Sequence, residues 1–237
     1  MSIFSSGLFS KNDFVSIIKF SNYNVNYNSN RDYENNYFSL ITRLHEFRTE
    51  NLNYGNKGIW RLKVAQIDIT TFNSFFIGAW GNRSNNYSEF MKQDYIDRAI
   101  KYIEGKGQKT LTCDDSIGYL SDFVEFVFCK SNPWPTLIYF SKFVSTFLPD
   151  IAIPFDTASL SKVAREYRIS RNTKELADYI NIHSNLRKDV LEFLNHNSMC
   201  VEDLKMLDDS TLIGRKHLFK SNQTPLNRPI DKIYYSV

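Results

Sequence analysis

The sequence is poor in the residues that mark several classes of protein. Only 9 glycines, 6 prolines and 3 cysteines occur among its 237 residues. Cys113, Cys129 and Cys200 lie far apart, and no CxxC pair is present. This usage argues against a disulfide framework or a zinc site. We therefore expect free and mostly buried thiols in a reducing cytoplasm.

Long hydrophobic runs are also missing. No apolar run approaches the roughly 20 residues that cross a bilayer. The first residues, MSIFSSGLFSKNDF, lack a charged region followed by an apolar run, so we expect no signal peptide. No internal repeat, low-complexity tract or obvious linker occurs. These absences predict a soluble, cytoplasmic protein without a membrane partner.

Aromatic residues are abundant instead, with 19 Phe and 14 Tyr in a 15% aromatic share. Most of them are expected to fill a core. The net charge of +3 is mildly basic, which permits a nucleic-acid partner without requiring one. The length suits one large domain or two small ones. We expect a single globular domain over residues 1–237, and two helical lobes of about 1–110 and 111–237 with a cleft between them are an alternative arrangement of it.

Apolar residues recur at helical spacing through most of the chain. The alternating segment 60–70 (WRLKVAQIDIT) predicts a strand or short hairpin, and the basic segment from residue 215 onward ends in a weakly strand-like pattern. We predict a mostly α fold with a helical hairpin and a short β-hairpin. Helices are expected near 12–20, 37–50, 71–80, 88–103, 116–130, 135–148, 159–167, 173–181, 184–196 and 201–207.

One stretch carries a family resemblance. Two apolar helices joined by SNPW are followed by the extended segment LPDIAIPFDT and then by a basic helix. This order resembles the site of the helix-hairpin-helix DNA glycosylase superfamily, where an invariant Asp follows the hairpin in a pattern like V-D-T-H. The sequence PTLIYFSKFVSTFLPDIAIPFDTASLSKVAREYR places Asp156-Thr157 at that position. The resemblance covers about residues 116–171, and the SNPW connector lacks the glycine-rich turn of the family.

The resemblance implies roles for two residues. Asp156 would stabilise the positive charge that builds on the sugar during cleavage of the N-glycosidic bond, and it would activate a water. The nucleophilic lysine of bifunctional members would fall at Ile138, one helical turn before Lys142. We therefore expect a monofunctional enzyme, with Lys142 as an alternative nucleophile or as a partner of Asp156. An Asp ahead of a helix is also typical of an N-cap, and the two interpretations of Asp156 are balanced.

The expected DNA contacts lie in the connector and on the helix after Asp156. Lys162 and Arg165 share a helix face that Arg168 continues, and such a row can neutralise successive phosphates. A row of this kind is more often a solvated face. Trp134 is the aromatic residue expected nearest to DNA, in a reaction that requires base flipping. The predicted nucleic-acid-binding residues are Lys130, Ser131, Asn132, Trp134, Lys162, Arg165, Arg168 and Arg171.

The sequence thus favours a DNA glycosylase that excises a damaged or modified base, in repair or in anti-phage defence, with DNA as its partner and without a cofactor or metal. Two other hypotheses stay open. The first is a non-catalytic nucleic-acid-binding or interaction domain that shares the helical hairpin. The second is a metal-dependent nuclease using the carboxylates of Asp114, Asp115, Asp122 and Glu125. No strand with a D…ExK pattern accompanies these carboxylates, so the nuclease ranks last.

Overall fold

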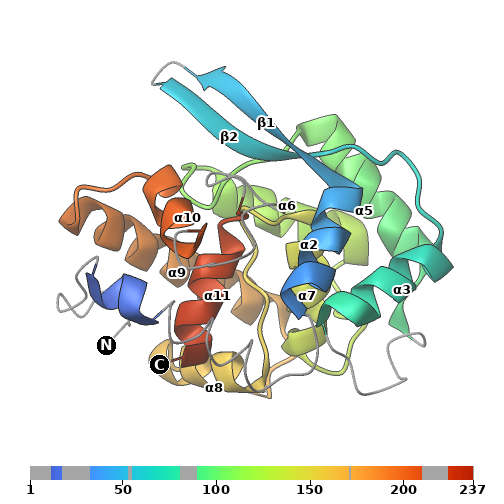
Figure 1. The fold of residues 1–237 in the computed structure, drawn as a ribbon. Coiled ribbons are helices and arrows are strands. Elements are labelled where there is room, and N and C mark those ends of the chain that lie inside the picture. Colours follow the sequence, from blue (N-terminus) through green and yellow to red (C-terminus); the bar gives the residue numbers. More distant parts are fainter. Residues whose placement is uncertain are drawn as a thin grey trace.

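The computed structural model describes residues 12–17, 33–52, 55–80, 90–170, 172–209 and 224–236. Within these ranges the chain is mostly helical, and the strands form one two-stranded antiparallel sheet (Figure 1). The prediction of a mostly α fold with a short β-hairpin is confirmed. In the same ranges no helix has the length and apolar character needed to cross a membrane.

Most helices begin and end close to where the apolar periodicity places them. One expected break, near residues 182–183, is absent, because Tyr179, Ile182, Leu186 and Val190 continue a single buried face along one helix over residues 176–196. A helical turn covers residues 12–17. The other helices are α2 (Tyr33–Leu44), α3 (Ile69–Trp80), α5 (Gln93–Lys106), α6 (Ser116–Phe128), α7 (Leu137–Phe147), α8 (Thr157–Glu166), α9 (Leu176–His196), α10 (Val201–Asp209) and α11 (Asn227–Ser236).

The β-hairpin lies earlier in the chain than predicted. Strand β1 (His45–Leu52) pairs with β2 (Gly55–Leu62), and the ribbon projects beyond the helical body (Figure 1). Residues 45–50 were expected to continue a helix, and that expectation is wrong. In this segment Phe47 lies opposite Trp60, with ring centroids 5.6 Å apart. A cross-strand aromatic pair of this kind stabilises an antiparallel ribbon.

Helix α7 lies at the centre of the core. Its buried face carries Phe140, Phe143 and Phe147, and these rings contact aromatic residues from α3, α6 and α9. Phe72 of α3, for example, stacks on Phe147 at 5.6 Å between centroids. The buried apolar residues form one cluster that includes both the N-terminal and the C-terminal parts of the described chain. The high aromatic content is therefore used mainly for packing.

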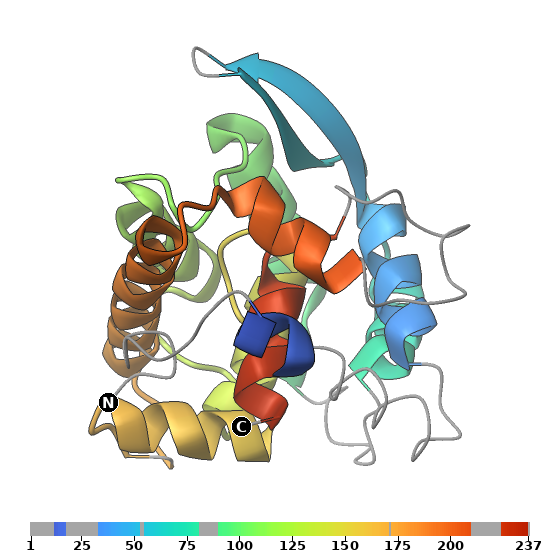
Figure 2. The ribbon, with the colours of Figure 1, turned by 60° about the vertical axis from the view of Figure 1, so that its left-hand side comes forward.

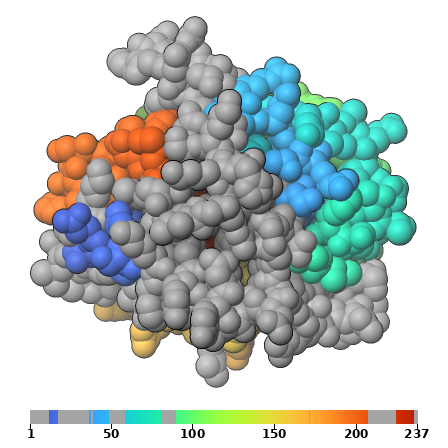
Figure 3. Space-filling model, viewed as in Figure 1, coloured from blue at the N-terminus to red at the C-terminus, as the bar shows by residue number. Residues whose placement is uncertain are grey.

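The C-terminal segment corrects a second expectation. Residues 227–236, read as weakly strand-like, form helix α11, whose Ile230, Ile233 and Tyr234 are buried at helical spacing. Figure 2 shows α11 running through the middle of the molecule, between α2 and the α8–α9 side. Figure 3 shows the face seen in Figure 1, with the surfaces of α2 and α3 on one side and of α10 on the other.

The three cysteines are free, and all three are exposed rather than buried. Cys129 ends α6 and Cys113 and Cys200 precede helices, so each occupies a position where the chain reverses at the surface. The expectation of buried thiols is corrected on this point.

Candidate active site

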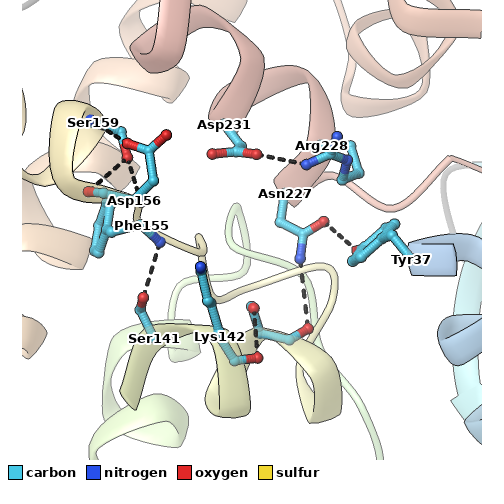
Figure 4. Close-up of polar contacts among 10 residues, drawn as sticks. Tyr37, Ser141, Lys142, Phe155, Asp156, Ser159, Asn227, Arg228 and Asp231 are labelled. Carbon is cyan, nitrogen blue, oxygen red and sulfur yellow. Dashed lines mark hydrogen bonds and ion pairs between the residues drawn. The ribbon is translucent and has the colours of Figure 1, made fainter. Parts of the chain in front are cut away.

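Lys142 extends from the middle of α7, and most of the other residues of this helix are buried. Its side chain points from α7 toward the segment carrying Asp156 and toward α11 (Figure 4). The Nζ atom lies 5.8 Å from the centroid of the Trp80 ring of α3. Within the part of the chain that the structure describes, the Lys142 ammonium makes neither a hydrogen bond nor an ion pair. The amine therefore lies near charged groups, and none of the described residues forms an ion pair with it.

Hydrogen bonds hold the extended segment that leads from α7 to Asp156. The Phe155 amide donates to Ser141 Oγ of α7 at 2.9 Å. The Ile153 amide donates to Nε2 of His183 at 3.0 Å, and this buried histidine donates through Nδ1 to the Tyr179 carbonyl. Because Nε2 must accept, His183 is neutral, in agreement with burial lowering its pKa to about 4. Asp156 is thus placed by contacts to both α7 and α9.

Asp156 is the N-cap of α8. Its Oδ1 accepts a hydrogen bond from the Ser159 amide at 2.6 Å, and its own amide donates to Ser159 Oγ at 2.8 Å, which completes a capping box. The prediction that Asp156 is an N-cap is therefore confirmed. Oδ2 makes no hydrogen bond within the described residues, and the side chain is only half-buried. Capping fixes the carboxylate in place and occupies one of its two oxygens.

Electrostatics distinguish Lys142 from an ordinary surface lysine. Desolvation by the surrounding helices lowers its pKa, against the opposing effect of the negative charges of Asp156 and Asp231. The Trp80 ring also favours the charged form, since a ring face attracts a cation. The effect of desolvation is larger than these opposing effects, so the pKa of Lys142 is lowered. The arrangement increases the share of uncharged amine at neutral pH, and the uncharged amine is the nucleophilic form.

Sequence reasoning missed the contribution of α11. Asp231 pairs with Arg228, whose Nη1 lies 2.5 Å from Asp231 Oδ2, and Arg228 stacks over the Tyr37 ring at 5.0 Å. Asn227 accepts a hydrogen bond from the Tyr37 hydroxyl at 2.8 Å and donates to the Ser145 carbonyl at 3.5 Å. The signal was present in NRPIDKIYY, where Arg228 and Asp231 are three residues apart and the apolar residues have helical spacing.

The basic residues after Asp156 are divided by the end of α8. Lys162 is half-buried and Arg165 is exposed, both on the helix. The nearby Asp156 favours the charged form of Lys162, but partial burial lowers its pKa. Arg168 lies past the C-cap with a left-handed φ of 58°, so it does not extend the row on that face as expected. Arg171 lies outside the described residues.

The connector between α6 and α7 uses its polar groups largely to build its own turn. Ser131 donates to the Phe128 carbonyl at 3.0 Å, and Asn132 Oδ1 accepts from the Trp134 amide at 2.9 Å. The exposed Lys130 lies 3.1 Å from Glu125. Asn132 also donates to the Lys174 carbonyl at 3.4 Å.

Trp134 requires a correction. Its side chain is 2% exposed and packs against the rings of Tyr95, Phe128, Phe140 and Phe143. No face of the ring is left for a nucleic-acid base, so its expected role at DNA is wrong. Of the tryptophans, Trp80 is the one that lies beside Lys142.

The carboxylates considered for a nuclease do not form a cluster. Asp114 pairs with Arg187 and Asp115 pairs with Lys109, at the start of α6. Across the described ranges, no group of three or more His, Cys, Asp or Glu side chains is placed to hold a metal ion. Lys142 and Asp156, together with Asp231 and Arg228, form the strongest candidate for a reactive site.

Comparison of the chain with protein families, with characterised proteins and with solved structures gives no match. The geometry of this site and the order of the elements around it are therefore the features that bear on function.

Proposed function

We propose that the chain is a DNA N-glycosylase whose reacting groups are the Lys142 amine and the Asp156 carboxylate. The observation that carries the proposal is the desolvated Lys142 amine, without an ion pair in the described part of the chain, beside a carboxylate held at a helix start. The order of two apolar helices, extended segment, Asp-Thr and basic helix supports the same proposal. The substrate would be DNA with a damaged or modified base, in repair or in anti-phage defence.

The lysine favours covalent chemistry over the water mechanism. The uncharged amine forms a bond to C1′ of the sugar while the bond from C1′ to the base breaks, and the base leaves with that electron pair and one amine proton. The second amine proton passes to O4′ as the sugar ring opens and a C=N bond forms. Water then hydrolyses this imine and restores the amine. A lysine in an ion pair would carry this chemistry out poorly, because its lone pair would be protonated.

Asp156 has two tasks in this proposal. Through Oδ1 it caps α8, which fixes the direction of the carboxylate. Its second oxygen can face the sugar and stabilise the positive charge that develops as the base departs. A carboxylate fixed in advance is more effective than a mobile one, since no reorganisation is needed during the reaction.

Lys162 and Arg165 would contact the phosphates on either side of the extruded nucleotide, because both lie on the helix that Asp156 begins. Contacts of this kind add salt-sensitive affinity without reading the sequence. Arg168 would follow at the turn after the helix.

The capping box favours a second candidate, a non-catalytic nucleic-acid-binding domain in which Asp156 only begins a helix. The substitution Asp156→Asn distinguishes the two functions. Asn caps a helix about as well as Asp. Asp156→Asn would therefore leave a binding domain intact, whereas it would remove the charge that a glycosylase needs.

The decisive experiment uses an oligonucleotide duplex with one abasic site, treated with the protein and borohydride in EDTA. An imine to Lys142 would be reduced to a stable adduct, and peptide mapping would place it on Lys142. This substrate carries the sugar aldehyde already, so the test does not depend on which base is recognised. Base release is then measured on duplex and single-stranded oligonucleotides with deaminated, oxidised or alkylated bases, and on modified phage DNA.

Matched variants make this experiment specific. Lys142→Gln should abolish the adduct, and Asp156→Asn should slow base release without loss of folded protein. Lys188→Gln, an exposed lysine of α9, should leave both unchanged. An adduct spread over many lysines, or equal trapping by Lys142→Gln, would overturn the assignment of the nucleophile. Release of no base from any substrate would favour the binding domain.

A further inference from the structure

Helix α11 places a second charged pair over the candidate nucleophile. Asp231 is one of two carboxylates whose negative charge acts on the Lys142 amine, the other being Asp156 of α8. Asp231 lies 2.5 Å from Arg228 Nη1, and both side chains are shielded from solvent, at 18% and 10% exposure. Figure 4 shows the Asp231–Arg228 pair on α11 facing the Lys142 side chain from α7.

The position of the pair is fixed by α2 and α7. Arg228 stacks on the Tyr37 ring of α2, and the neighbouring Asn227 joins the Tyr37 hydroxyl to the Ser145 carbonyl of α7. Ser145 Oγ in turn donates to the Lys142 carbonyl at 3.0 Å. These contacts tie the start of α11 to the turn of α7 that carries the lysine.

We propose that Arg228 and Asp231 act as a positioning pair that sets whether the Lys142 amine carries a proton. The proposal deepens the proposed function and rests on it for its catalytic consequence. Asp231 alone would stabilise the ammonium form of Lys142. Arg228 neutralises most of that charge at short range, so Asp231 stays in place without holding the lysine protonated.

The surroundings of Lys142 leave few other groups for this task. Asp156 on α8 is the other negative charge that acts on the amine, and Lys162 lies close enough to Asp156 to oppose it. From α3 the neighbour is the uncharged Trp80 ring. The lowered pKa of Lys142 shows that desolvation outweighs the opposing negative charges of Asp156 and Asp231.

The test measures the protonation of Lys142 in the free protein, without DNA. Trace acetylation is followed from pH 6 to pH 11 by mass spectrometry of the peptide containing Lys142, with exposed Lys188 as the internal reference. Arg228→Gln removes the positive charge beside Asp231 and should raise the midpoint by about one pH unit, which is the usual effect of a nearby opposite charge. Asp231→Asn removes the carboxylate and should lower the midpoint by a similar amount.

Two further variants control for packing. The double variant Arg228→Gln/Asp231→Asn removes both charges and should return the midpoint close to that of the natural protein. Arg228→Lys keeps the charge and should shift the midpoint less than Arg228→Gln. Shifts of the same sign in the two single variants, or no shift in Asp231→Asn, would overturn the proposal. Asp231→Asn decides the matter if Arg228→Gln does not fold, because the carboxylate is the less buried partner.

The outcome can be separated from that of the proposed function. Opposite shifts without any adduct on abasic DNA would support the positioning pair and reject the glycosylase. An adduct on Lys142 without opposite shifts would do the reverse. If both hold, the pH at which adduct formation reaches half its maximum should move with the midpoint of each variant.

Discussion

Lys205 and Lys142 both lie near carboxylates, and they are held in opposite ways. Lys205 of α10 is 1% exposed, and its Nζ lies 2.9 Å from Oδ1 of the buried Asp150, although the contact falls short of hydrogen-bond geometry. Lys142 faces Asp156 and Asp231, yet its ammonium pairs with neither in the described structure. A buried charge without a partner lowers the stability of the folded protein. Asp150 supplies the opposite charge for Lys205, so Lys205 is a structural residue. The unpaired amine is the arrangement that a nucleophile requires.

The largest effect on stability is expected when the buried Lys205–Asp150 ion pair is broken. Asp150→Asn keeps the shape of the side chain and an oxygen for the Leu226 amide, which donates to Oδ1 at 2.9 Å. It leaves the Lys205 charge buried without a partner. We expect the free energy of unfolding in urea to fall by about 3–5 kcal/mol.

A double variant tests the cause of this loss. Asp150→Asn/Lys205→Met removes both charges, and an apolar replacement of a buried pair is often neutral. It should therefore recover most of the stability. A loss of less than about 1 kcal/mol in Asp150→Asn would mean that this ion pair contributes no more to stability than an ordinary surface pair. Lys205 would then not differ from Lys142 as a structural residue.

Acid should weaken the scaffold that holds both lysine sites. His45 accepts from Gln108 and donates to the Thr146 carbonyl of α7, and burial lowers its pKa and that of His183 from 6.5 to about 4. Between these values the unfolded chain binds protons that the folded protein does not. Stability should therefore fall as pH drops from 6.5 to 4, by about 3 kcal/mol for each histidine.

Urea unfolding at a series of pH values between 7.5 and 4.5 measures this slope. Carboxylates also titrate near the acid end, so the comparison that counts is with His183→Gln. That variant keeps an acceptor for the Ile153 amide and cannot be protonated. Its slope should be shallower than that of the natural protein, and an unchanged slope would show that His183 is not the group responsible.

The sequence predicted the part of the site that is local in the chain. Lys142 and Asp156 belong to one continuous stretch, in which helix, extended segment and N-cap each leave their own pattern. Asp231 and Arg228 were missed because the basic C-terminal segment was read as weakly strand-like, although its apolar spacing was helical. Their meeting with Lys142 depends on how α11 packs against α2 and α7, which no local pattern records.

The errors have the same origin. Trp134 was expected at DNA because a connector usually lies at the surface, but four aromatic side chains from α5, α6 and α7 enclose it. Residues 45–50 follow a helix and could extend it by propensity alone. The cross-strand contact of Phe47 with Trp60 instead selects the strand, and tertiary contacts override local propensity in such cases.

A smaller effect separates the two roles of Asp156. Asp156→Ala removes the cap and should lower the free energy of unfolding by about 1 kcal/mol. Asp156→Asn should cost less, because the amide oxygen still accepts from the Ser159 amide. Ser159→Ala removes the other half of the capping box while the carboxylate stays, so it should destabilise α8 and still support base release. Equal loss of base release in Asp156→Asn and Ser159→Ala at matched folded fractions would mean that helix capping alone explains Asp156.

The smallest change in stability is expected at Lys142, together with the largest change in chemistry. Lys142→Met removes a desolvated charge that has no ion-pair partner among the described residues, and it keeps a flexible side chain of similar length. The free energy of unfolding should stay the same or rise by about 0.5–1 kcal/mol, as is common where a destabilising functional group is replaced. The adduct with abasic DNA should disappear. A strong loss of stability would instead show that the amine holds the fold together, as Lys205 does, and Lys142 would then belong on the structural side of the comparison.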